Sequence, residues 1–133
     1  MKNVLPSEFK IGHEFAFFLH DLLAQIVVEG EKANIFQVPV TFRSQADAEA
    51  IRDLSGEELW SWLQANRYEW VNLELSYKQL IVALLADFCQ FVYEALRCSE
   101  KGKLAVTYTL LRKPFKDNLF YLEWLLEPIR KQE

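Results

Sequence analysis

The stretch from Leu80 to Cys98 reads LIVALLADFCQFVYEALRC and decides the fold. Its four strongly polar residues recur at intervals of three and four: Asp87, Gln90, Glu94 and Arg97. On a helix this spacing gathers them into one narrow stripe and leaves every other direction apolar. The pattern therefore predicts a buried central helix, whose core is expected to include Leu84, Leu85, Phe88, Phe91, Val92 and Leu96.

The composition favours a single mainly α domain. Hydrophobic residues make up 51% of the 133 residues, which is enough apolar material to close one core. Gly and Pro number four each, so long helices are favoured over a turn-rich β sandwich. We expect residues 1–133 to form one antiparallel helical bundle, either alone or as one domain of a longer protein.

Three long helices are expected in this bundle. The first begins at the N-cap residue Ser7 and ends at Glu29, before Gly30. The central helix begins between residues 73 and 76 and ends near Ser99. A short turn over residues 101–103 then brings the last helix, about residues 103–126, back antiparallel.

The last helix carries two prolines and two apolar lines. Pro114 predicts a kink or a helix restart because it frees the carbonyl of Leu110, and Pro128 is expected to end the helix. One apolar line is expected to be the buried face: Leu104, Tyr108, Leu111, Phe115, Leu119, Leu122 and Leu126. The other predicts a homodimer contact, unless the aromatic insertion covers it: Leu110, Phe120 and Trp124.

An insertion of about residues 31–72 separates the first two long helices. Residues 31–43 alternate apolar and polar, but Pro39 has no amide donor, so this segment is extended or at most an edge strand. Two short helices follow, over residues 45–54 behind Ser44 and from the capping box at Ser55 to near Asn66. The aromatic residues of the insertion are expected to form a satellite core rather than a ligand cage: Trp60, Trp62, Tyr68 and Trp70.

The charge distribution offers one candidate binding surface. The basic residues of a local edge over residues 97–116 are the candidates for an anion or ligand: Arg97, Arg112, Lys113 and Lys116. Arg112 and Lys116 lie four residues apart and could clamp an anion. The whole chain is acidic, with a net charge of −4 and a pI near 5.3, so nucleic-acid binding has little support.

The residues that could carry catalysis are too far apart for a compact site. His13 and His20 are two turns apart, about 10 Å along a helix axis, and Asp87 and Glu94 have the same spacing. Glu94 can pair with Arg97. The polar stripe of Asp87, Gln90 and Glu94 either faces solvent or lines a crevice against the last helix. We expect no catalytic residue, no metal and no cofactor, since nucleophile and phosphate-loop motifs are also absent from the sequence.

The cysteines and the apolar stretches indicate a cytoplasmic protein. Cys89 and Cys98 are about 13 Å apart on one helix, too far for a disulfide, and are expected to be reduced. No apolar run typical of a signal peptide precedes Phe15. The central stretch is nearly long enough to span a bilayer, but Asp87 and Glu94 would be costly there, so we expect no membrane association.

The last helix contains LLRKPFKDNLFYLEWLL, residues 110–126. With the antiparallel helices expected over residues 73–127, this segment resembles the HEPN-type helical bundles and the uncharacterised bacterial helical domains associated with them. HEPN ribonucleases carry an arginine followed four to six residues later by a histidine. Here both histidines precede the first arginine, Arg43, so that motif does not occur. The resemblance implies a noncatalytic member that binds or dimerises.

These observations lead to three functional hypotheses. The first is a noncatalytic helical interaction or dimerisation domain, with a second copy or another protein as its partner. The second is a helical bundle that binds a small ligand or nucleic acid through the basic edge over residues 97–116. The third, a hydrolase that uses carboxylates or a metal, has the least support, and we expect no ribonuclease or metal-dependent turnover.

Overall fold

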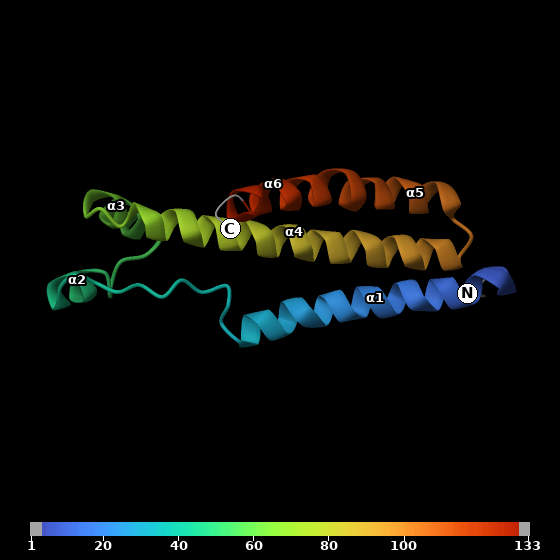
Figure 1. The fold of residues 1–133 in the computed structure, drawn as a ribbon, viewed down its shortest axis with the longest axis horizontal. Coiled ribbons are helices and arrows are strands. Elements are labelled where there is room, and N and C mark those ends of the chain that lie inside the picture. The colour runs from blue at the N-terminus through green and yellow to red at the C-terminus, as the bar shows by residue number, and fades with distance from the viewer. Residues whose placement is uncertain (1–3, 131–133) are drawn as a thin grey trace.

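The computed structural model describes residues 4–130, with side chains to residue 128, and its regular elements are all helical (Figure 1). The predicted mainly α fold is therefore confirmed. The elements are α1 (Ser7–Lys32), α2 (Gln45–Ala50), α3 (Gly56–Ala65), α4 (Glu69–Glu100), α5 (Leu104–Lys113), the π-helical turn η1 (Pro114–Asn118) and α6 (Leu119–Arg130).

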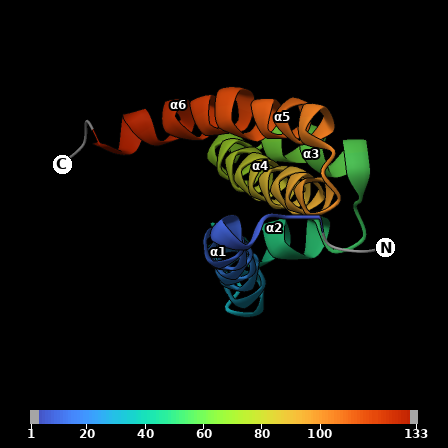
Figure 2. The same cartoon turned by 90° about the vertical axis from the view of Figure 1, so that its right-hand side faces the viewer.

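Helix α4 is the centre of the arrangement. It packs against α1 on one side and against α5, η1 and α6 on the other (Figures 1 and 2). The predicted turn reverses the chain between α4 and α5: Gly102 adopts φ 71° and its amide donates to the carbonyl of Ser99. Helix α1 and the α5–α6 segment lie on different sides of α4, so the three long helices form an open layer.

The insertion forms the predicted satellite core at one end of this layer. Tyr68 is 2% exposed and packs with Leu63 and Val71. Its ring stacks on Trp62 at a centroid distance of 5.7 Å and meets Phe42 edge-on at 5.8 Å. The other two aromatic residues of the set remain more open to solvent: Trp60 and Trp70. Residues 38–42 lie between two bends, at Gln37 and Arg43, and form no strand, as Pro39 predicts.

Several helix ends differ from the prediction. Helix α1 continues past Gly30 to Lys32, and Gly30 makes room for packing, since a Cβ there would lie 2.7 Å from Ile35 Cδ1. Helix α4 begins directly after the buried Tyr68, since Arg67 at φ 61° already separates it from α3. Pro128 lies inside α6 and does not end it.

Two expectations about burial are wrong. The six residues expected in the core of α4 are half-buried, because α4 is covered on two sides and open between them: Leu84, Leu85, Phe88, Phe91, Val92 and Leu96. On the last helix the buried face consists of Thr107, Pro114, Asn118 and Leu125. Most of the line predicted to be buried is exposed; the exposed residues are Leu104, Tyr108, Phe115, Leu119 and Leu126.

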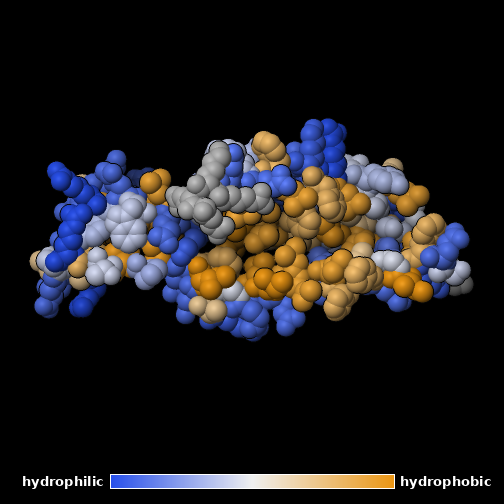
Figure 3. Space-filling view, in the orientation of Figure 1, coloured by the Kyte–Doolittle hydropathy of each residue, from blue (hydrophilic) through white to orange (hydrophobic). Residues whose placement is uncertain are grey.

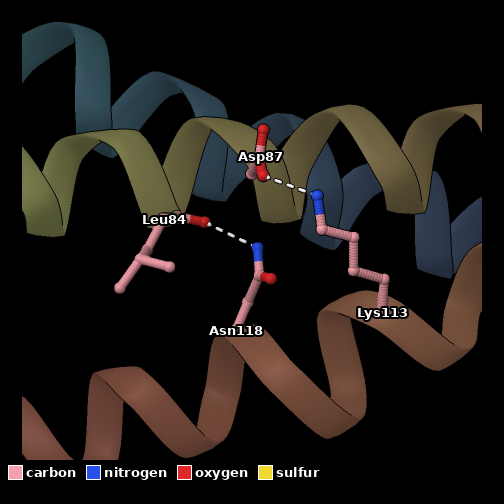
Figure 4. Close-up of polar contacts among 4 residues, drawn as sticks. All are labelled: Leu84, Asp87, Lys113 and Asn118. Carbon is pink, nitrogen blue, oxygen red and sulfur yellow. Dashed lines mark hydrogen bonds and ion pairs between the residues drawn. The ribbon is translucent and has the colours of Figure 1, made fainter.

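Pro114 changes the geometry of the last helix, as its sequence position predicts. The five residues that it opens form a π-helical turn rather than a sharp break. Within this turn Asn118 is 2% exposed, and its Nδ2 donates to the carbonyl of Leu84 at 3.1 Å (Figure 4). The π turn therefore places a polar residue against the backbone of α4 and turns the neighbouring apolar residues outward.

Candidate functional site

An apolar groove runs between α1 and the α5–η1 segment, with α4 as its floor; we refer to it as the α1–α5 groove. It consists of two adjoining cavities of about 600 and 280 Å³, which share Ala16 as a lining residue. Apolar side chains gather over this part of the molecule in Figure 3, whereas the end with α2 and α3 is more polar.

The walls of the α1–α5 groove are built from exposed aromatic and aliphatic residues. Helix α1 contributes Phe9 and Leu19, and the opposite wall contributes Leu104, Tyr108 and Phe115. All five are among the exposed large hydrophobic residues of the described chain, and Tyr108 is 72% exposed. Part of the line that the sequence assigned to the buried face thus forms one wall of an open groove: Leu104, Tyr108 and Phe115.

Both histidines face this groove and are not arranged for metal binding. The His13 ring meets Phe17 edge-on at 5.2 Å, and its Nε2 is buried without a hydrogen-bond partner. The His20 ring lies 5.4 Å from the Tyr93 ring, and its Nδ1 is 2.9 Å from Asp21 Oδ1. Within residues 4–130, no group of three His, Cys, Asp or Glu side chains is placed to hold a metal ion.

The polar stripe of α4 lies on the surface. All four of its residues are exposed: Asp87, Gln90, Glu94 and Arg97. Asp87 Oδ2 accepts from Lys113 Nζ at 3.0 Å, as Figure 4 shows. Arg97 pairs with Glu100 at 3.0 Å instead of with Glu94, the pair expected from the sequence.

Two of the four basic candidates form ion pairs. Arg97 and Lys113 are each paired with a carboxylate, and Lys113 Nζ also lies 4.3 Å from the centroid of the Phe91 ring. Arg112 and Lys116 are exposed on the last helix. Charge pairing therefore uses two of the four basic residues that the sequence proposed for an anion site, and one of these pairs joins α4 to the last helix directly through Asp87 and Lys113.

The predicted interface residues of the last helix form a second exposed surface. Phe120 and Trp124 are each 62% exposed, and Leu110 is half-buried. Trp124 lines a cavity of about 410 Å³ with Tyr77 and Leu125, and the Tyr77 hydroxyl donates to the Leu125 carbonyl there. This surface and the α1–α5 groove are therefore two separate candidates for a contact with a partner.

Both cysteines are free and half-buried, and burial raises the pKa of the Cys89 thiol. Because the thiolate is the reactive form, Cys89 in a Cys98→Ser variant is expected to react with iodoacetamide more slowly at neutral pH than an exposed thiol. Its rate should rise as the pH passes above the ordinary range of a cysteine. A denatured sample of the same variant provides the control, and equal rates in the folded and denatured samples at neutral pH would contradict this prediction.

Comparison with family models, with curated proteins and with solved structures found no match for this chain. The geometry itself therefore defines the class: a mainly α layer of three long helices with an open apolar groove. By length and composition, α1 and α4 could each cross a membrane. This is weak evidence, because the core helices of soluble proteins and signal sequences pass the same test.

Proposed function

We propose that this chain is a noncatalytic helical interaction domain that associates with itself in the cytoplasm. The observation that carries the proposal is its exposed surface, which totals 10121 Å². A compact monomer of 15.7 kDa exposes about 7,300 Å². The chain therefore has an excess of about 2,800 Å² over a compact monomer of its mass.

The chemistry of the exposed surface supports association. Large apolar residues are exposed along α1 and along α5–α6, whereas soluble monomers rarely expose contiguous apolar patches above a few hundred Å². Obligate homodimers bury about 1,000–2,500 Å² on each partner, so an interface at the upper end of this range covers most of the excess of this chain.

Three further observations support a noncatalytic role in a reducing compartment. The Arg-to-His motif of the HEPN ribonucleases, which the last helices resemble, does not occur in the sequence. The histidines lie among aromatic rings, Asp87 pairs with Lys113, and Glu94 is exposed. Cys89 and Cys98 are free thiols, which are typical of cytosolic proteins.

Sedimentation velocity on the full chain over a dilution series tests the proposal. We expect a single boundary with a mass of twice 15.7 kDa, which shifts toward the monomer only at high dilution. A ribonuclease assay on the same sample should show no turnover. A monomer at the highest soluble concentration would contradict self-association, and turnover that survives repeated purification would contradict the noncatalytic role.

A further inference from the structure

We propose that a second copy of this chain covers the α1–α5 groove through a twofold interface, in which the exposed aromatic residues of each groove wall pack into the groove of the other copy. This inference rests on the proposed self-association and specifies its surface. It places the contact at the groove and not at the Phe120 and Trp124 surface that the sequence favours.

A twofold interface needs projecting and receiving features on the same face, because each copy presents the same patch. Tyr108, which is 72% exposed, and Phe9, which is 58% exposed, project from the two walls of the larger cavity. Gly12 and Ala16 lie one turn apart on α1 and line that cavity, and a Cβ added at Gly12 would have no atom within 4 Å. The groove therefore combines large exposed side chains with unfilled space beside small ones.

The exposed area of the whole chain and the low charge of this face both fit a second copy. The chain as a whole exposes about 2,800 Å² more than a compact monomer of its mass, which is about the area that one partner of a large obligate dimer buries. Glu8 is the one acidic residue that lines the two cavities. The other titratable side chains that line them are His13, His20 and Tyr108. Two copies of a face with so little charge can meet without strong repulsion.

A protein fits this face better than a lipid bilayer does. The groove is concave, and its floor is formed by Phe88 and Val92 of α4, which a flat bilayer surface cannot reach.

A matched pair of charge substitutions on α1 tests the inference. Leu19 lines the groove and Val28 does not, although each is 47% exposed. They are nine residues apart, which places them on opposite faces of the helix at 100° per residue. In sedimentation equilibrium of the full chain, Leu19→Glu is expected to weaken the dimer by about 100-fold or more, because it buries an unpaired carboxylate in the interface. Val28→Glu should leave the dissociation constant unchanged.

Three other results would each contradict a different part of the proposal. A dimer that persists in a helical Leu19→Glu variant but is lost in Trp124→Ala would overturn the groove interface and leave self-association intact. A monomeric parent would overturn the proposed function itself. Flotation of the parent, but not of Leu19→Glu, with phosphatidylcholine vesicles would contradict a second copy in the groove and assign the groove to a membrane.

If Leu19→Glu loses helical content, Tyr108→Glu replaces it as the test variant, since the largely exposed Tyr108 side chain contributes little to the monomer fold.

Discussion

Replacing Tyr68 with alanine is expected to lower the free energy of unfolding by about 3–5 kcal/mol, the usual cost of removing a fully buried aromatic ring. Tyr68 is 2% exposed and is the centre of the satellite core, stacked on Trp62. Its hydroxyl donates to Asp47 Oδ2 and accepts from the amide of Arg43, both at 2.9 Å. One side chain therefore connects α2, α3 and the start of α4.

Urea denaturation monitored by tryptophan fluorescence measures this loss, and Tyr68→Phe is the matched control. The phenylalanine keeps the ring contacts but leaves the Arg43 amide and the Asp47 carboxylate without their partner, which costs about 1–3 kcal/mol. If Tyr68→Phe destabilises as much as Tyr68→Ala, the hydroxyl contacts and not the ring packing hold the satellite core. A loss below about 1 kcal/mol for Tyr68→Ala would contradict its burial.

Asn118→Asp is expected to destabilise the fold by about 3 kcal/mol or more at neutral pH. The substitution keeps the shape of a side chain that is 2% exposed but replaces the donor Nδ2 with a carboxylate oxygen that faces the Leu84 carbonyl (Figure 4). A buried carboxylate without a donor disfavours its charged form, so burial should raise the pKa of this new group in the folded state.

The pH dependence of Asn118→Asp identifies the cause of its destabilisation. Because the folded protein holds the proton more tightly than the unfolded chain, the penalty is small below about pH 4 and grows as the pH rises toward the folded-state pKa. Below that range the protonated carboxyl can donate to the Leu84 carbonyl. The stability difference from Asn118→Ala, measured by urea denaturation from acidic to neutral pH, checks this trend. A difference that does not change with pH would contradict the contact.

The helices and the chain reversal follow from local patterns. Apolar periodicity and the turn at Gly102 predict three antiparallel helices, and Pro114 predicts a change in the last one. The role of Gly30 depends on Ile35 and Phe36 packing against it, a contact that a stop signal cannot reveal. Helix boundaries were therefore less predictable than the helices themselves.

The groove could not be identified from the sequence, because an apolar line shows that a face avoids water but not what covers it. The Leu104 and Tyr108 line has the periodicity of a buried face, yet the small or polar Thr107, Pro114 and Asn118 pack closely against α4 instead. Ion pairing was equally hidden, since Asp87 and Lys113 are 26 residues apart. The groove and the loss of free positive charge both arise from contacts between distant segments.

The most direct test of the groove interface is the labelling rate of a thiol placed in it, measured against protein concentration. In a Cys89→Ser/Cys98→Ser background, Leu19→Cys reports on the groove and Val28→Cys on the opposite face of α1. We expect labelling of Leu19→Cys by a maleimide to slow markedly as the concentration rises through the dimer dissociation constant, while Val28→Cys reacts at a constant rate. Concentration-independent labelling of both thiols in a sample that sediments as a dimer would contradict a second copy in the groove.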